Sequence, residues 1–168
     1  KEKTLRKVSE TVKSTPEDAP ARVAHLVDEL KNLQKELNSI KEKMANQSVN
    51  DLLDKAEEVS GIKVLAARLD QLDMNALRNM TDNLKNRLGP SVVVLASGLD
   101  GKVSIVVSAT KDAVNRGIHC GKIFGEAAKA AGGGGGGRPD MAQAGGKDVN
   151  GIDKAIGIAV KMIREQLA

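Results

Sequence analysis

The sequence predicts an α/β protein with a helical coiled-coil arm followed by a small globular domain that has a mixed β-sheet and packed helices. Apolar residues recur at helical spacing over the first third of the chain, and short β-branched runs then alternate with amphipathic helical segments. A chain of 168 residues has room for one domain and an appendage. We therefore expect an arm over residues 1–47 and a globular domain over residues 48–168.

The arm is predicted from two apolar periodicities on either side of a proline-containing break. Leu5, Val8 and Val12 follow helical spacing, and two prolines then interrupt it within residues 14–20. Beyond the break, apolar residues alternate at steps of three and four, as in the seam of a left-handed coiled coil. These residues are Val23, Leu26, Leu30, Leu33, Leu37, Ile40 and Met44.

The seam predicts a helix over residues 21–46, roughly 39 Å long at 1.5 Å per residue. Its apolar stripe either pairs with another helix or packs on the neighbouring domain. The segment from Leu5 to Val12, folded back at the prolines, is one candidate for an antiparallel mate. A stripe this narrow favours a spacer or a dimer stalk over simple packing on a domain.

The first part of the globular domain is predicted from local signals. A polar joint at residues 46–48 ends the arm, and apolar spacing over residues 49–59 predicts a short helix that ends at Gly61. The apolar run over residues 62–67 has the length of a strand. Asp73 is suited to cap a helix whose apolar positions reach Leu88 and which Gly89-Pro90 closes.

The second part adds a hairpin and two helices. The β-branched runs 92–96 and 103–107 predict a hairpin with a longer loop between them. Helices are expected from about residue 119 to 131 and from about residue 152 to 167. The inward-facing residues we expect are Ile123, Ala127 and Ala131 in the first of these helices and Ile156, Val160, Ile163 and Leu167 in the second.

Composition excludes several classes of protein. Phe124 is the single aromatic residue, so recognition of bases by stacking on aromatic side chains is almost unavailable. One cysteine, Cys120, excludes an internal disulfide and a four-cysteine zinc site, which fits a reducing, cytoplasmic compartment. No apolar run approaches the roughly 20 residues of a membrane span. Because the chain begins at Lys1 with neither Met nor an apolar signal region, we expect it to be part of a longer protein.

Charge is distributed unevenly along the sequence. Residues 1–60 hold 11 Lys+Arg and 12 Asp+Glu, a net charge of −1, whereas residues 61–168 hold 15 and 10, a net charge of +5. Such an asymmetry indicates a module that faces a polyanion, joined to a neutral spacer.

Six consecutive glycines, residues 132–137, precede Arg138 and form the most informative segment. Glycine allows backbone N–H groups to converge on an anion, so the segment can bind phosphate or carboxylate. It is not a P-loop, because Arg138-Pro139 replaces the Lys and hydroxyl residue that would contact phosphate and Mg²⁺. It also follows a predicted helix and not a strand, which removes the context for a dinucleotide-binding loop.

The segment GGGGGGRPDMAQAGGKD, together with VVVLAS and GKVSIVVSATKD before it, resembles the DHH-associated domain in the C-terminal part of alanine–tRNA ligases. GIKVLAARLDQLDMNALRNMTDNLK and STPEDAPARV are similar to the same family, so the resemblance covers essentially the whole chain. It implies a tRNA-binding and domain-bridging fragment that contacts the tRNA elbow and couples aminoacylation with editing. The implied partners are tRNA and the catalytic and editing domains of the same protein. The ATP, Mg and Zn of the family belong to those other domains, and no cofactor or membrane contact is expected here.

The resemblance also directs attention to particular residues. In related DHH-family phosphoesterases a glycine-rich loop ends in a His that contacts substrate phosphate, and Arg138 stands in that place here. The candidate tRNA- or phosphate-binding residues are Gly135, Gly136, Gly137, Arg138, Gln143, Lys147, Lys102, Lys111, Arg116 and Lys122. A phosphoesterase substrate-binding domain and a coiled-coil dimerisation element, giving a homodimer through the arm, are the alternatives to tRNA binding.

Catalysis is not expected of this chain, because few suitable groups are present. His25 lies on the predicted coiled coil, and His119 and Cys120 are adjacent, so on a helix they point about 100° apart. Zinc requires three or four convergent ligands, and we expect no metal site. A buried, inert thiol is the expectation for Cys120.

Overall fold

The structure is a computed structural model that describes residues 2–168, apart from the side chains at positions 41, 42, 45 and 46. It forms two compact units, Lys1–Gln47 and Ser48–Ala168. The elements in chain order are α1 (Glu2–Thr11), α2 (Ala19–Leu53), β1 (Glu57–Val59), β2 (Ile62–Arg68), α3 (Met74–Leu88), β3 (Ser91–Leu99), β4 (Lys102–Ala109), α4 (Lys111–Asn115), α5 (Cys120–Ala130), β5 (Met141–Gly146), the 3₁₀ turn η1 (Val149–Gly151) and α6 (Ile152–Leu167).

The first unit confirms the helix over Leu5 to Val12 and the break that follows it. In the break, the hydroxyl of Thr15 donates a 2.9 Å hydrogen bond to Asp18 Oδ2, and the proline-rich segment turns before α2 begins. Pro20 lies in the first turn of α2, where its missing N–H costs no intrahelical hydrogen bond.

Helix α2 continues without a break through the polar joint predicted at residues 46–48, and the two units divide within this joint, between Gln47 and Ser48. The joint contains no Pro or Gly, and Val49 and Leu52 extend the helix because their side chains are buried in the second unit. The helix predicted over residues 49–59 is helical as far as Leu53, where α2 ends, so its predicted end at Gly61 was wrong. Residues 57–59 form strand β1, and the Ser60-Gly61 turn, with φ of 52° and 79°, returns the chain into β2. Two positive φ values give a turn whose twist matches that of a hairpin.

The five strands form one sheet in the order β1-β2-β3-β4-β5. Only β2 and β3 pair in parallel, through the crossover helix α3, and the other neighbours are antiparallel. The β3–β4 hairpin is confirmed, but its loop is shorter than predicted. Asp100-Gly101 alone makes the turn, with φ of 51° and 71°, because Leu99 still pairs with Lys102.

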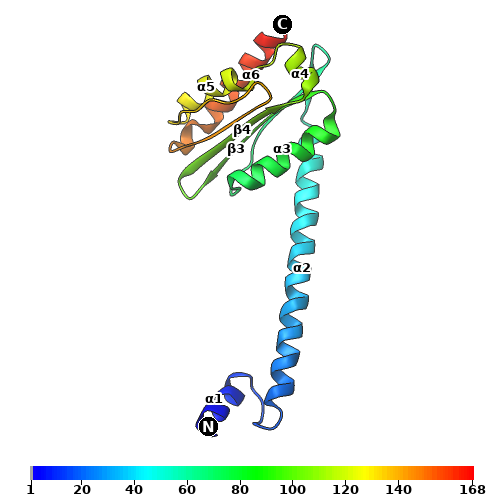
Figure 1. Ribbon diagram of the computed structural model, residues 1–168, viewed down its shortest axis with the longest axis vertical. Coiled ribbons are helices and arrows are strands. Elements are labelled where there is room, and N and C mark those ends of the chain that lie inside the picture. Colours follow the sequence, from blue (N-terminus) through cyan, green and yellow to red (C-terminus); the bar gives the residue numbers. More distant parts are fainter. Residues whose placement is uncertain (1) are drawn as a thin grey trace. The chain divides into compact units, whose positions relative to one another are not determined.

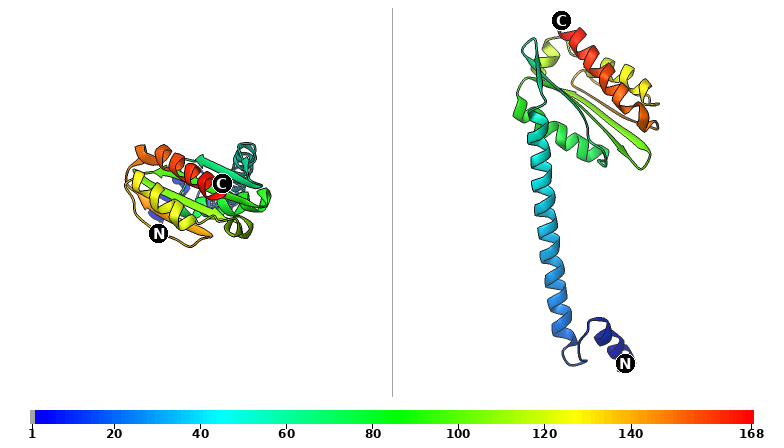
Figure 2. Two further views of the ribbon diagram at one scale, coloured as in Figure 1. Left: turned by 90° about the horizontal axis from the view of Figure 1, so that it is seen from above. Right: turned by 180° about the vertical axis from the view of Figure 1, so that it is seen from behind.

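The sheet is covered on both faces (Figure 1). On one face, α3 packs on Leu65, Val93 and Val106 together with the last turns of α2. On the other face α5 and α6 lie side by side, which the view from behind also shows (Figure 2). Phe124 is fully buried in this second layer. The predicted mixed sheet with packed helices is confirmed.

Helices α5 and α6 follow the predicted bounds closely, but the buried face of α6 differs. Ile163 and Leu167 face inward as expected, whereas Ile156 and Val160 remain half-buried. The buried positions of the first turns are taken by Ala155 and Ala159 instead. Small side chains allow close packing, and α6 lies against both α5 and the sheet.

Candidate nucleic-acid interface

The glycine segment 132–137 runs antiparallel beside β5, a strand that the sequence analysis did not predict. A Cβ at Gly137 would overlap the backbone and side chain of Ala142, and a Cβ at Gly133 would overlap the carbonyl oxygen of Gly145. At Gly134 and Gly136, by contrast, a Cβ would meet no atom within 4 Å. Alternate glycines are therefore required by packing, and the intervening ones face open space.

The end of this segment also caps helix α5. The N–H groups of Cys120 and Gly121 donate to the carbonyls of Pro139 at 2.9 Å and Arg138 at 3.2 Å. The next N–H, that of Lys122, donates to His119 Nδ1 at 3.3 Å. The first turn of α5 is therefore already satisfied by the protein.

The backbone amides that remain for an anion are those of Gly134, Gly135 and Gly136. All three residues are exposed, and their N–H groups donate no hydrogen bond to any residue that the structure describes. Gly137 instead forms a bridge with Ala142, and the Arg138 N–H donates to Met141 O at 2.9 Å. Of the glycines predicted to bind phosphate, Gly135 and Gly136 therefore have a free backbone N–H that can donate to an anion.

Arg138 is exposed and paired with a neighbour in the chain. Its Nε lies 3.2 Å from Asp140 Oδ1, and Nη2 donates to Asp140 Oδ2 at 3.3 Å. The Arg138 side chain is 76% exposed. Exposed pairs of this kind contribute little to stability, so the guanidinium can exchange the carboxylate for a phosphate at small cost.

The sheet separates the predicted cations into two groups. Strands β2, β3 and β5 begin at one end of the sheet, where β4 also finishes, and we call this the α4 end. The opposite end of the sheet, at the Asp100-Gly101 turn, is called the turn end. Arg138 lies at the α4 end, because Ala109 N donates to Asp140 O there. The predicted cations Lys111, Arg116 and Lys122, from α4 and the first turn of α5, lie at the same end.

Lys102 and Lys147 lie at the turn end. Val103 pairs with Gly146, so the next position along each strand brings these two lysines to the same edge. The surroundings are acidic, since Lys102 shares a hollow with Asp73 and Asp100. Further carboxylates lie at this end. Asp70 accepts a hydrogen bond from Gly98 N, Asp148 directly follows Lys147, and Asp153 forms an ion pair with Arg68.

The α4 end has the more favourable electrostatics for a polyanion. Lys111 and Lys122 are exposed and form no ion pair with any residue described in the structure. Arg116 uses Nη1 to donate to Ser60 O at 2.6 Å, a neutral acceptor that leaves its charge uncompensated. The carboxylates at this end include Asp112, Asp140, which is paired with Arg138, and Glu58, which lies opposite Lys63 at the start of β2.

The side chain of Gln143 lies on the face of the sheet opposite to α5. Its neighbours Ala142 and Ala144 in β5 face the α5 layer, so Gln143 faces α3, where Oε1 accepts a hydrogen bond from Arg78 Nε. Arg78 is a functional candidate that the sequence analysis did not single out, and its only sequence signal is a positive charge in the middle of a predicted helix.

The two structural units do not divide the charge as the sequence boundary at Gly61 did. Residues 1–47 hold 10 Lys+Arg and 8 Asp+Glu, and residues 48–168 hold 16 and 14, so each unit carries +2. The acidic residues of the segment 48–60, such as Glu57 and Glu58, offset the excess of positive charge that follows. The asymmetry therefore lies within the second unit and not between the two units.

Cys120 is buried against the sheet, and desolvation, with a smaller contribution from the charge of Asp140, raises the pKa of its thiol to about 12. At neutral pH this thiol is protonated and shielded, which makes it a poor nucleophile. His119 faces the helix start through Nδ1. Within the described part of the chain, no three His, Cys, Asp or Glu side chains are placed to hold a metal ion.

The domain has a five-stranded mixed sheet, with α3 on one face, α5 and α6 on the other, and a glycine segment beside β5. These features together define the class of domain to which this chain belongs. A family model described as the DHHA1 domain matches residues 61–166. The chain therefore belongs to the DHHA1 domain family.

Curated relatives with similar sequences are alanine–tRNA ligases. The chain is 55% identical over 167 residues to the alanine–tRNA ligase of Acetivibrio thermocellus, covering 99% of this chain and 19% of that protein. It is 44% identical over 163 residues to that of Clostridioides difficile, covering 97% of this chain and 18% of that protein. The chain thus spans about a fifth of the length of these ligases.

Solved structures agree with this assignment. The C-Ala domain of Aquifex aeolicus alanyl-tRNA synthetase superposes with a TM-score of 0.56 at 30% identity, over 67% of this chain and 96% of that chain. A DHH-domain protein described as a member of a family of ribosomal proteins matches with a TM-score of 0.53 at 17% identity, over 80% of this chain and 33% of that chain. The second likeness shows the fold alone. Among the described residues, no helix has both the length and the apolar character of a membrane span.

Proposed function

We propose that this chain is a tRNA-binding module without chemistry of its own, and that the α4 end of its sheet contacts the tRNA elbow. The observation that carries the proposal is the gathering there of Lys111, Lys122, Arg116 and Arg138, of which Arg138 alone is ion-paired among the residues that the structure describes. The similarity to alanine–tRNA ligases and to a C-Ala domain supports tRNA as the polyanion.

The binding chemistry would consist of phosphate and shape recognition. Lysine and arginine side chains neutralise phosphates, and the free amides of residues 134–136 add hydrogen bonds to phosphate oxygens or 2′-hydroxyls. Phe124 is buried, so no aromatic side chain is available to stack on bases. Selection of alanine would then reside in other domains of the ligase, and this module would couple aminoacylation with editing by holding the tRNA for both.

Titration of the chain with tRNA, followed by filter binding at several salt concentrations, tests the proposal. Three or four phosphate contacts predict that log K falls with log salt concentration with a slope of about −3. Chemical footprinting of the same complex should protect the elbow. Absence of binding at low salt, or protection at the acceptor end alone, would contradict the proposal.

A second candidate function is dimerisation through α2. The seam residues of this helix other than Leu26 are exposed, with Leu30 at 64%, Leu33 at 62% and Leu37 at 50%. A contiguous apolar stripe of this length normally has a partner. Sedimentation equilibrium at several concentrations would show a dimer that dissociates on Leu30→Glu, and a strict monomer would remove this candidate.

The phosphoesterase alternative has less support. It rests on a glycine-rich loop that ends in His, and Arg138, which is paired with Asp140, occupies that position. Arginine can bind phosphate, but it stays protonated at neutral pH and cannot exchange protons as an imidazole does.

A further inference from the structure

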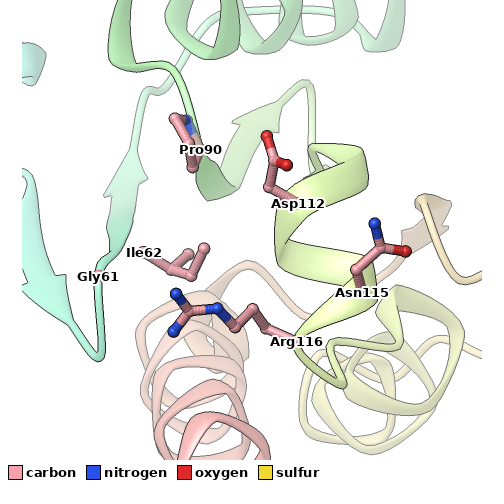
Figure 3. A pocket seen from close by; sticks show the side chains of 6 residues that line it. All are labelled: Gly61, Ile62, Pro90, Asp112, Asn115 and Arg116. Carbon is pink, nitrogen blue, oxygen red and sulfur yellow. The ribbon is translucent and has the colours of Figure 1, made fainter.

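A cavity at the α4 end is distinct from the glycine segment, and one of the cations described above, Arg116, lines it. Its volume is about 300 Å³, at the lower limit of small-molecule sites, so it suits a single flat ring system. The residues that line it are Gly61, Ile62, Pro90, Asp112, Asn115 and Arg116 (Figure 3).

The two sides of the cavity differ in chemistry. Ile62 begins β2 and Pro90 directly precedes β3, and together they give an apolar wall. The polar side comes from Asp112, Asn115 and Arg116. Asn115 and Arg116 follow Asp112 by three and four residues along α4 and its C-cap, so all three side chains share one face of this short helix. Figure 3 shows the Arg116 side chain reaching from α4 toward Ile62.

Arg116 is held in place, whereas the other two polar groups are free. Its guanidinium donates to Ser60 O at 2.6 Å and lies 3.7 Å from the position that a Cβ of Gly61 would take. The Asp112 carboxylate and the Asn115 amide form no hydrogen bond or ion pair with any side chain or backbone group that the structure describes. The cavity therefore offers a fixed flat cation, an unpaired acceptor and an unpaired amide.

We propose that this cavity binds one unstacked guanine of an RNA partner, an inference that rests on the RNA-binding function proposed above. The chain lacks Trp and Tyr, and Phe124 is buried, so an arginine plane is the stacking surface that it can present to a base. Arg116 provides that plane beside the apolar wall of Ile62 and Pro90.

The polar groups match the Watson–Crick edge of guanine. A carboxylate accepts hydrogen bonds only, and guanine presents two adjacent donors, N1–H and the N2 amine, to the Asp112 oxygens. The Asn115 amide can donate to guanine O6. Adenine and cytosine would instead place a ring nitrogen acceptor against the carboxylate, and uracil would place two carbonyls beside it. Lys111, directly before Asp112, is available for the phosphate of the same nucleotide.

Nuclear magnetic resonance titration of the whole chain with guanosine 5′-monophosphate (GMP) tests this proposal. Inosine 5′-monophosphate (IMP) is the matched probe, because it keeps the phosphate and lacks only the N2 amine. We expect GMP to shift the amide signals of Gly61, Ile62, Asn115 and Arg116, with IMP binding about tenfold weaker because one carboxylate oxygen loses its donor. Equal binding of GMP and IMP, shifts elsewhere, or no shift at about 10 mM GMP, where even a millimolar Kd would be detected, would overturn the proposal.

Variants separate the cavity from the rest of the surface. Asp112→Asn should weaken GMP binding about tenfold and abolish the preference over IMP, whereas Asp54→Asn, the same change at an exposed position outside the cavity, should leave both unchanged. Asn115→Ala, which keeps the carboxylate, should weaken GMP and IMP equally. If Asp112→Asn leaves the preference for GMP intact, the cavity does not read guanine.

Filter binding of tRNA to the same proteins distinguishes failure of this inference from failure of the proposed function. tRNA binding without any selective GMP shift would overturn the guanine site and leave the tRNA function standing. Selective GMP binding without tRNA binding would remove the tRNA function, while the cavity would remain a guanine site.

Discussion

At the scale of single residues, the glycine segment has two different structural requirements. Gly137 is in contact with Ala142 on the side where a Cβ would lie, and Gly136 faces open space without a positive φ. Gly137→Ala should therefore lower the free energy of unfolding by about 1–3 kcal/mol, because backbone atoms must move apart. Gly136→Ala should change the free energy of unfolding by less than about 1 kcal/mol. This variant is the control for the loss of backbone freedom that any Gly→Ala substitution causes in the unfolded chain.

Urea unfolding followed by far-ultraviolet circular dichroism measures both variants, since the chain has no Trp for fluorescence. Equal stability of the two variants would contradict the packing of the segment beside β5.

Arg138 is predicted to contact phosphate after it leaves Asp140. Arg138→Ala should weaken tRNA binding roughly tenfold and reduce the salt slope by about one. Asp140→Asn should instead tighten binding, because it removes the competing carboxylate while the Asp140 backbone carbonyl keeps its bond from Ala109 N. Filter binding across salt concentrations measures both, with Arg6→Ala, at an exposed position of α1 outside the second unit, as the control. An unchanged slope would exclude Arg138 from the interface.

The buried thiol of Cys120 makes stability depend on pH in the alkaline range. Its pKa is raised to about 12 in the folded protein, whereas the unfolded thiol ionises near the ordinary pKa of 9.0. The unfolded state therefore loses the proton first, and the stability contributed by this group is present below about pH 9 and is lost as pH rises toward 12.

Cys120→Ala should remove this dependence, so that the two proteins differ in slope by up to about 1.4 kcal/mol per pH unit in that range. Urea unfolding between about pH 8 and about pH 11 measures the difference. No tyrosine is present to titrate in the same window. Parallel slopes for the two proteins would show that the thiol is not desolvated.

At the scale of elements, the cap of α3 is a local feature that the sequence predicted and the structure confirms. Asp73 Oδ1 accepts a 2.8 Å hydrogen bond from Ala76 N. Asp73→Ala should destabilise the protein by about 1 kcal/mol, whereas Asp73→Asn keeps an acceptor and should cost less. Thermal unfolding of both variants tests the cap, and equal losses would assign the effect to charge instead.

The two strands that were not predicted from the sequence share a physical reason. Strand β1 has three residues, two of them glutamates, and β5 consists of Met, Ala, Gln and Gly residues without β-branched side chains. Neither has a local preference for extended structure. Each is a strand because a neighbouring strand supplies its hydrogen bonds, β2 for the first and β4 for the second.

At the scale of the whole molecule, both apolar clusters are built from residues at or after Val49. Residues 48–168 should therefore fold alone and bind tRNA within about threefold of the full chain, because the cations of the α4 end all belong to this unit. Residues 1–47 alone should show no measurable tRNA binding. Filter binding with the two fragments tests this, and loss of binding in residues 48–168 would require a contribution from the first unit.

The sequence by itself determined helices α1, α3, α5 and α6, the central hairpin and the family, because periodicity, capping residues and the glycine segment are local features that neighbouring residues specify. Only the tertiary structure decided which cations share a surface. It placed Arg138 with Lys122 and put Lys102 with Lys147 among carboxylates, and it formed the Arg116 cavity from three separate segments. Register between strands brings distant residues together, and a single sequence does not state that register.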